Sequence, residues 1–211
     1  MNIRRVVSII AAALALLSSV SAGELKGRIQ AAEGPVVVWV EGVNGAIPSQ
    51  DTPITHIAGG AFEPGISIGF VGREFVLKNE DDKLHNTHLY MRSAHQNDVS
   101  GRPLKFGSTV YNVALPRSGS TVKKPIKPYH RYRDDTGYIE IVCNAHPNER
   151  AFLLVFDHPY AAIAGSDGAF KLTNIPAGKH EVRYWHGGEV KVWQTVEVED
   201  SVATDIMIEL E

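Results

Sequence analysis

The sequence has few of the residues on which several common protein classes depend. Of 211 residues only one is a cysteine, at position 143, so neither an internal disulfide nor a zinc site built from paired cysteines can form. The formal net charge is −3, which excludes a general attraction to nucleic acid or anionic lipid. Phosphate-binding glycine loops and His-Glu-x-x-His helices are also missing. Nine histidines, by contrast, are numerous enough to suggest a metal site.

The long apolar run of the chain is confined to its beginning. Two arginines, at positions 4 and 5, precede an apolar run over residues 6–17, and Val20-Ser21-Ala22 offers the small residues that a signal peptidase accepts. The run is shorter than the roughly 20 residues that a membrane span requires. We therefore predict that residues 1–22 are a signal peptide and that the mature chain is periplasmic or secreted, without a membrane span. Loss of the two arginines changes the formal net charge from −3 to −5.

Beyond residue 22 the chain lacks helical periodicity and consists of short β-rich runs separated by Gly, Pro, Asn and Asp. This pattern predicts an all-β protein. Eleven strands are expected, too many for one small sandwich, so we predict two, with a break near Asp157-His158-Pro159. The expected strands cover residues 25–29, 36–40, 66–71, 74–78, 87–91, 109–113, 138–143, 152–156, 169–172, 181–185 and 190–198.

The residues best suited to chemistry lie between positions 138 and 156. Ile139, Ile141 and Cys143 alternate along one strand, which directs Cys143 inward at its end. A polar, proline-stiffened loop follows, with His146 three residues after the cysteine, and an apolar strand returns. A thiolate and an imidazole so placed can bind one metal ion. The alternative is a cysteine that merely packs in the core.

A second imidazole is expected from a different strand. His85 opens a strand after the charged turn at residues 79–83, and a trigonal copper site with two histidines and one cysteine needs such a ligand. Asn86 is expected to join the two loops by hydrogen bonds. His88 would lie on the opposite face of a regular strand, as a surface residue or as an additional metal ligand.

These motifs resemble a known family. The turn at residues 79–86, Cys143-Asn-Ala-His146-Pro147 and the apolar strand after it are similar to the cupredoxins, in particular to exported plastocyanin-like proteins of the methylamine utilisation type. The resemblance implies a Greek-key β-sandwich with copper as cofactor. The run AGSDGAFKLTNIPAG at residues 164–178 and VRYWH at residues 182–186 resemble the carboxypeptidase regulatory-like repeat, a small transthyretin-like sandwich. That second resemblance implies a fold and no activity.

One position departs from the cupredoxin pattern. The residue six after the cysteine is usually methionine in that family, and here it is Glu149. Met91 is expected roughly 20 Å from His85 along a strand, and Met207 lies in the last strand, so neither replaces it. Glu149 is an axial carboxylate ligand, a solvated loop residue or an ion-pair partner of a basic neighbour such as Arg150. As a ligand it would favour Cu(II) and lower the reduction potential.

The sequence leaves the role of the first strands open. Residues 23–43 either extend the cupredoxin-like sandwich or pair with the tail, in which case the cupredoxin-like part is an insertion. We accordingly divide the chain into the signal peptide (1–22), N-terminal strands shared with either sandwich (23–56), a copper domain (57–156) and a regulatory-like domain (157–211).

The function expected from these features is one-electron transfer by a single copper ion. The metal ligands would be His85, Cys143 and His146, with Glu149 as a fourth. Periplasmic copper delivery or storage is the alternative, and a small copper redox enzyme with an open coordination position is a third hypothesis. The partner would be a redox protein or a copper acceptor. The basic residues between positions 117 and 133 would either steer an acidic partner or form a solvated loop.

Overall fold

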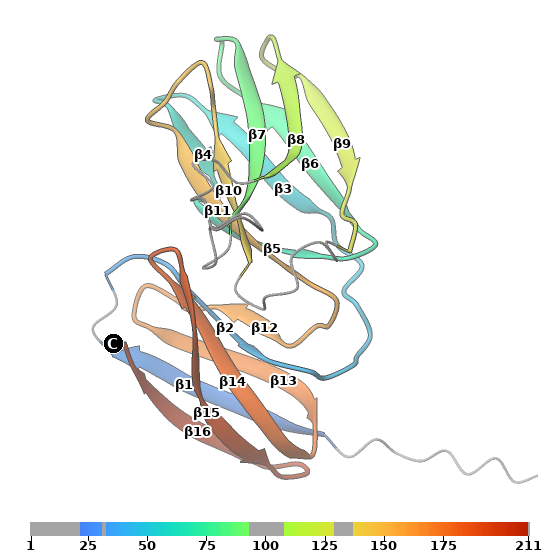
Figure 1. The fold of residues 1–211 in the computed structure, drawn as a ribbon, viewed down its shortest axis with the longest axis vertical. Helices are drawn as coiled ribbons and strands as arrows, with labels where there is room; N and C mark the ends of the chain where they lie inside the picture. The colour runs from blue at the N-terminus through green and yellow to red at the C-terminus, as the bar shows by residue number, and fades with distance from the viewer. Residues whose placement is uncertain (1–21, 31–32, 93–107, 129–136, 211) are drawn as a thin grey trace, which may run out of the picture.

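The structure is a computed structural model that describes residues 22–30, 33–92, 108–128 and 137–210. Over these ranges the regular secondary structure is entirely β-strand, arranged as two stacked sandwiches (Figure 1). The all-β prediction is therefore confirmed. The predicted signal peptide lies outside the described residues apart from Ala22. In the described ranges no helix has the length and apolar character to cross a membrane.

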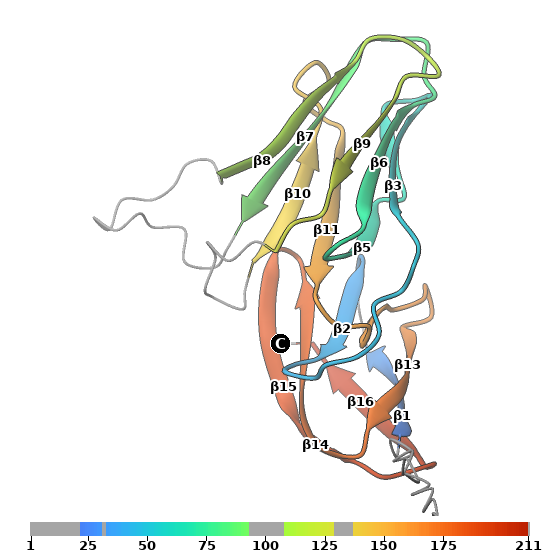
Figure 2. The same ribbon diagram turned by 90° about the vertical axis from the view of Figure 1, so that its right-hand side faces the viewer.

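The upper sandwich contains two sheets built from residues 52–156. Its first sheet has the order β5-β11-β10-β7-β8, and its second has the order β4-β3-β6-β9. Figure 2 shows β7, β8 and β10 on one side and β3, β6 and β9 on the other. The strands are β3 (Thr52–Ile57), β4 (Ala61–Glu63), β5 (Ile66–Phe70), β6 (Glu74–Asn79), β7 (His85–Arg92), β8 (Ser108–Leu115), β9 (Thr121–Pro125), β10 (Tyr138–Val142) and β11 (Arg150–Phe156).

The core of the upper sandwich follows from alternation along the strands. In β6, Phe75 and Leu77 point inward between half-buried neighbours, and in β10 the buried Ile139 and Ile141 face them. Cys143 continues the inward row of β10 and is itself 1 % exposed. The core therefore leads directly to the end of the sandwich where the β10–β11 loop lies.

The lower sandwich combines the first two strands of the chain with the last five. One sheet has the order β13-β1-β16 and the other β12-β2-β14-β15. These strands are β1 (Ala22–Gln30), β2 (Val36–Val40), β12 (Ala161–Ile163), β13 (Ala169–Pro176), β14 (Gly178–His186), β15 (Glu189–Val198) and β16 (Ala203–Glu209).

The upper sandwich is inserted into the lower one. β1 pairs with β13 and β16, and β2 pairs with β12 and β14, so the first strands complete the sheets of the tail and do not extend the upper sandwich. The upper sandwich begins before residue 57, where the sequence predicted its boundary, because it includes β3. It pairs with β4 and β6, which brings residues 52–56 into the upper sandwich.

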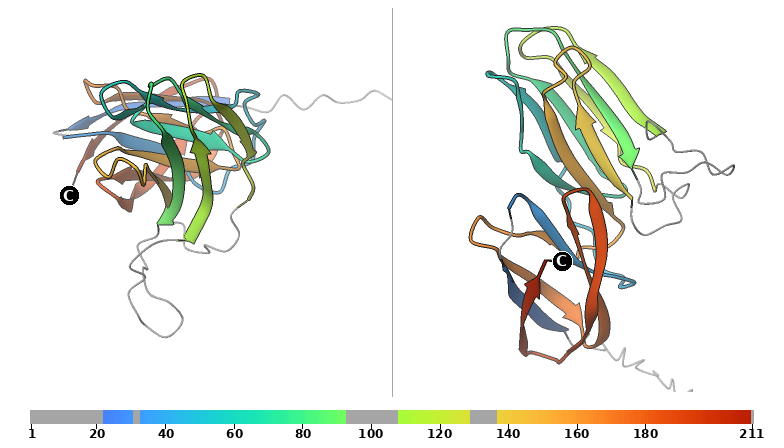
Figure 3. Two further views of the ribbon diagram at one scale, coloured as in Figure 1. Left: turned by 90° about the horizontal axis from the view of Figure 1, so that it is seen from above. Right: turned by 60° about the vertical axis from the view of Figure 1, so that its left-hand side comes forward.

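An aromatic cluster joins the two sandwiches. Trp39 of β2 and Trp185 of β14 pack against β11, with ring centroids 5.4 Å from Phe156 and 5.0 Å from Phe152, respectively. β11 is apolar on both faces because one face covers the upper core and the other covers this interface. β11 runs from the β10–β11 loop, at the far end of the molecule, down to the lower sandwich, as the right-hand view of Figure 3 shows.

Candidate metal centre

Strand ends bring three predicted ligands together at the far end of the upper sandwich. His85 is the first residue of β7, Cys143 follows β10 directly, and His146 lies in the loop before β11. Two backbone hydrogen bonds shape this loop: the amide of His146 donates to the carbonyl of Cys143, and the amide of Glu149 donates to that of His146. The chain thus turns back every three residues, which places the side chains of residues 143, 146 and 149 on the same side.

The potential ligand atoms of these three residues form a compact triangle. Sγ of Cys143 lies 3.7 Å from Nδ1 of His85 and 3.6 Å from Nδ1 of His146, and the two nitrogens are 3.2 Å apart. Three atoms at these separations share a point about 2.0 Å from each of them, which matches a bond from a transition ion to imidazole nitrogen and is slightly short for a thiolate. The residues present therefore fit a single bound ion.

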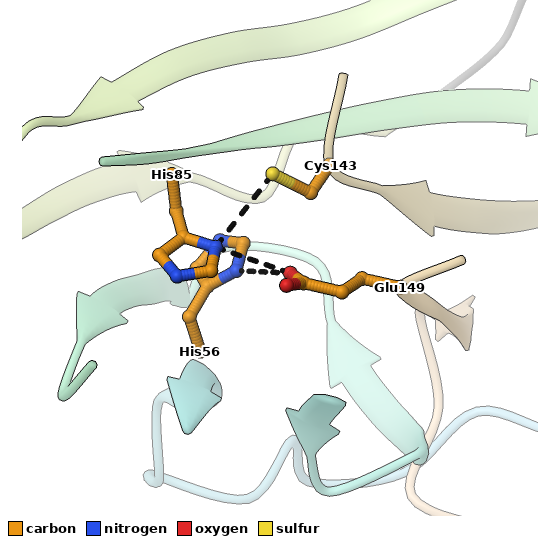
Figure 4. Close-up of side chains that lie close together, drawn as sticks. All are labelled: His56, His85, Cys143 and Glu149. Carbon is orange, nitrogen blue, oxygen red and sulfur yellow. Dashed lines mark hydrogen bonds and ion pairs between the residues drawn. The ribbon is translucent and has the colours of Figure 1, made fainter. Parts of the chain in front are cut away.

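Glu149 faces this triangle from inside the protein. Its Oε2 lies 3.1 Å from Nδ1 of His85 (Figure 4). Its Oε1 lies 3.4 Å from Nδ1 of His146. The side chain is 2 % exposed, which contradicts a solvated loop residue. Arg150 does not pair with it, because the guanidinium binds Glu140 at 2.9 Å. The structure thus contradicts two of the expected roles, the solvated residue and the pair with Arg150, and it places the carboxylate beside the imidazoles of His56, His85 and His146.

His85 lies between two carboxylates. Its Nε2 is 3.1 Å from Oδ2 of Asp81, and its Nδ1 is 3.1 Å from Oε2 of Glu149. The hydrogen bond from His85 is the main reason why the pKa of Asp81 is held below its ordinary value. A cation bound here would replace a proton on Nδ1, whose lone pair would then face the ion beside the thiol and the second imidazole. Oε1 of Glu149 is buried there without a hydrogen-bond partner among the described residues, and a cation would satisfy these acceptors together.

Sequence analysis missed one member of the cluster. His56 of β3 is fully buried, and its Nδ1 lies 3.1 Å from Oε2 of Glu149. It belongs with His85, Cys143 and Glu149 to a group whose potential ligand atoms all lie within 4.8 Å of one another. Burial lowers the pKa of His56, with the hydrogen bond to Glu149 opposing the shift. The available signal was its alternation with Ile54, which directs a histidine into an otherwise apolar core.

Asn86 connects the two loops, as the sequence suggested. Its Oδ1 accepts a hydrogen bond of 2.8 Å from the amide of Asn144, and its own amide donates to Sγ of Cys143 at 3.5 Å. Its Nδ2 donates to Asn112 on the neighbouring strand β8. The thiolate position is therefore held from the β7 side as well as from β10.

His88 is not part of the cluster, and its expected surface exposure is wrong. It lies on the opposite face of β7 from His85, where its two ring nitrogens contact Oδ1 of Asn144 at 3.0 Å and Oγ1 of Thr109 at 2.9 Å. It is buried because Asn144 and β8 cover it and the ring of Tyr90 packs on it. Both nitrogens are thus engaged away from the metal position.

The cluster lies beside an open cleft. His146 is the most exposed member, at 33 % for its side chain, and with Glu149 it lines a cleft of about 400 Å³. Gly59 and Gly60 of the β3–β4 turn also line the cleft, and a Cβ atom on Gly60 would lie 3.6 Å from Oε1 of Glu149. Small molecules therefore have access to the His146 side of the cluster.

The methionines and the basic stretch lie elsewhere. Met91 is packed in the upper core and Met207 is exposed on β16 of the lower sandwich. In the described part of the basic stretch, Lys123 pairs with Asp51 and Glu74. Its residues 129–133 lie outside the described ranges.

No protein-family model and no curated protein matches this sequence. Several solved structures do resemble this chain. The purple cupredoxin from Nitrosopumilus maritimus matches with 17 % identity and a TM-score of 0.32, covering 50 % of this chain and 100 % of its own. A reduced amicyanin variant matches with 14 % identity and a TM-score of 0.34, covering 56 % and 98 %.

A copper-containing nitrite reductase from Thermus scotoductus matches with 16 % identity and a TM-score of 0.34, covering 56 % of this chain and 25 % of its own. The identities are low and each overlap is partial. The case for a metal ion therefore depends on the distances between side chains in this protein and not on these similarities.

Proposed function

We propose that this protein is an exported mononuclear copper protein whose main role is one-electron transfer. The observation that carries the proposal is the triangle of two imidazole nitrogens and one sulfur, with edges of 3.2 to 3.7 Å, held by two neighbouring strands of one sheet and the β10–β11 loop. Two imidazoles with one thiolate are the ligand set of copper electron-transfer sites. When bound, copper would supply a one-electron Cu(II)/Cu(I) couple.

The surroundings of the ligands support electron transfer over copper delivery. Asp81 fixes the ring of His85, and Asn86 ties the cysteine loop to β7, so the ligands are held in position without the metal. Such a prearranged site needs little rearrangement when the charge of the ion changes. The side chain of His146 is 33 % exposed, so a redox partner can approach it from the surface. A delivery protein would instead need ligands that detach readily.

Glu149 is proposed as the fourth ligand. Its carboxylate is buried, faces both nitrogens of the triangle and has one oxygen for which the described residues supply no hydrogen-bond partner. A hard anionic oxygen stabilises Cu(II), so the reduction potential is expected to be low for a site of this type. Burial of this charge without a cation is costly, which further supports metal binding.

Copper titration with optical and electron paramagnetic resonance spectroscopy tests the proposal. We expect one equivalent of Cu(II) to bind, with a thiolate-to-copper charge-transfer band and a reversible one-electron couple in spectroelectrochemistry. Rapid, complete transfer of Cu(I) to bicinchoninate would favour copper delivery. A copper complex without the thiolate band would contradict the proposed site.

The cleft favours a second candidate function, a small redox enzyme that uses an open coordination position. His146 and Glu149 line this cleft of about 400 Å³, so a small molecule can approach the metal position from that side. Azide is a suitable probe. A saturable change in the Cu(II) spectrum on addition of azide would support this function, and an unchanged spectrum would favour electron transfer alone.

The sequence carries two further proposals. Export rests on the predicted signal peptide at residues 1–22, and N-terminal sequencing of protein recovered from the periplasm or medium would test it. We also propose that the lower sandwich is a transthyretin-like packing or docking module, as the runs at residues 164–178 and 182–186 indicate. The partner of the copper site is proposed to be a redox protein.

A further inference from the structure

His56 stands behind Glu149 in the core of the upper sandwich. Its Nδ1 lies 3.1 Å from Oε2 of Glu149, and its Nε2 lies 2.9 Å from Oγ1 of Thr87. All three side chains are buried, and Thr87 shares the inward face of β7 with His85. The ring of His56 is packed between Phe62 and His85, with centroids 4.4 Å from each, so it has little freedom to turn.

We propose that His56, supported by Thr87, is a positioning residue that holds the carboxylate of Glu149 toward the metal. This inference rests on the proposed copper site. The direction of the hydrogen bonds follows from the chemistry of the acceptor: an ionised carboxylate only accepts, so Nδ1 of His56 donates to Oε2. Nε2 then has a lone pair, and the hydroxyl of Thr87 donates to it. The result is a one-way chain from Thr87 through His56 to Glu149.

The two carboxylate oxygens of Glu149 have different contacts. Oε2 receives the N–H of His56 and also lies 3.1 Å from Nδ1 of His85, whereas Oε1, 3.4 Å from Nδ1 of His146, is buried without a hydrogen-bond partner in the described part of the chain. Oε1 is therefore the oxygen left for the ion. Hydrogen bonding to Oε2 also draws charge from the carboxylate and makes it a weaker metal donor. His56 thus sets both the orientation and the donor strength of the fourth ligand without touching the ion.

The first test uses the metal-free protein. Two-bond ¹H–¹⁵N spectra of the histidine rings report which nitrogen carries the proton. We expect the Nδ1–H form for His56, with the proton on the nitrogen that faces Glu149. The Nε2–H form for His56 would overturn the proposal, because the ring would then present a lone pair to the carboxylate.

The second test is a double-mutant cycle on the reduction potential of the copper-loaded protein. We expect His56→Leu to lower the potential, because the carboxylate loses a hydrogen bond that weakens it as a donor. In a Glu149→Gln background the same substitution should leave the potential unchanged. An equal shift in both backgrounds, or no shift in either, would overturn the proposal.

Two substitutions of Thr87 form a matched pair that should preserve the fold. Thr87→Val retains the shape but loses the hydroxyl, and Thr87→Ser retains the hydroxyl. We expect Thr87→Val to shift the potential in the same direction as His56→Leu, and Thr87→Ser to behave like the unsubstituted protein. Equal potentials for the two variants would count against the chain of hydrogen bonds.

Pulsed electron paramagnetic resonance separates positioning from direct ligation. Signals from the remote nitrogens of two histidines are expected, and a third histidine signal that disappears in His56→Leu would make His56 a ligand instead. Absence of the thiolate-to-copper band from the spectrum of the unsubstituted, copper-loaded protein would refute the copper site itself. That outcome is distinct from failure of the role assigned to His56, which the metal-free spectra address.

Discussion

Nε2 of His85 lies 3.1 Å from Oδ2 of Asp81, four residues earlier in the chain. The β6–β7 turn fixes this carboxylate: the amide of Asp82 donates to its Oδ1, and its own amide donates to Oδ1 of Asn79. Asn79 is anchored in turn by a hydrogen bond to the carbonyl of Leu115. The charged turn before β7 therefore orients the first metal ligand.

Replacement of Asp81 should weaken copper binding. We expect Asp81→Ala to lower the copper affinity by about 10–100-fold, because His85 loses the partner that fixes its ring and protonation. Competition titration against a chelator measures this change. The matched control is Glu80→Gln, which removes a neighbouring exposed carboxylate and should leave the affinity unchanged. Equal losses in the two variants would point to net charge as the cause.

Replacement of Glu149 should change the geometry and potential of the copper site. We expect Glu149→Met to raise the reduction potential and to shift the spectrum toward that of a blue copper site, because a weak thioether replaces an anionic oxygen. Glu149→Gln keeps the shape but loses the charge, and should raise the potential as well. Spectroelectrochemistry measures both. Identical spectra and potentials in all three proteins would exclude the carboxylate as a ligand.

The interface between the sandwiches should depend strongly on Trp185. This residue is 1 % exposed and packs on Phe152 and Tyr138, and its Nε1 has no hydrogen-bond partner among the described residues. We expect Trp185→Ala to reduce the free energy of unfolding by about 3–5 kcal/mol. Trp185→Phe should cost less, since it keeps an aromatic ring and removes the unpaired N–H.

Chemical denaturation of the metal-free protein measures both interface variants. The copper spectrum should be unchanged in each, because the site lies at the other end of β11. Equal losses for Phe and Ala at position 185 would show that packing of the ring is not what stabilises the interface.

His158 should make stability depend on pH. The residue is buried, its Nδ1 accepts a hydrogen bond from the amide of Tyr160, and burial lowers its pKa, with Glu41 and Asp157 opposing the shift. The folded state therefore prefers neutral His158. Its contribution is present in full above the unfolded pKa of about 6.5 and is lost as the pH falls from there through the folded pKa.

The matched variant is His158→Phe, which keeps an aromatic ring but cannot accept that hydrogen bond. At pH 8 it should be less stable than the unsubstituted protein by about 1 kcal/mol. The difference should narrow as the pH falls to 5, because only in the unsubstituted protein does protonation of residue 158 in the unfolded chain favour unfolding. Denaturation at several pH values measures the difference, in which the other titrating groups cancel. A difference that stays constant would contradict this assignment.

Local sequence patterns sufficed to predict part of the site. Alternation along β10 predicted that Cys143 points inward, and the spacing of three residues predicted that His146 accompanies it. Position 149 was indicated by the resemblance to cupredoxins alone, and three roles for Glu149 remained open. The loop meets this prediction through its two turns of backbone hydrogen bonds. His85 could be inferred because copper sites of this kind take one histidine from another strand.

Long-range pairing accounts for what the sequence did not reveal. His56 reaches Glu149 only because β3 pairs in parallel with β6, a contact that no local pattern encodes. The first strands pair with segments more than a hundred residues away, so both arrangements of residues 23–43 were compatible with their composition. His88 is buried by Asn144 and β8, whose positions the alternation in β7 does not specify.

X-ray absorption spectroscopy at the copper edge tests the proposed centre most directly. For the mature protein loaded with one equivalent of copper, we predict one sulfur scatterer at about 2.3 Å together with imidazole scattering at about 2.0 Å. The sulfur contribution should disappear in Cys143→Ser. A first shell of nitrogen and oxygen alone in the unsubstituted protein would contradict the account.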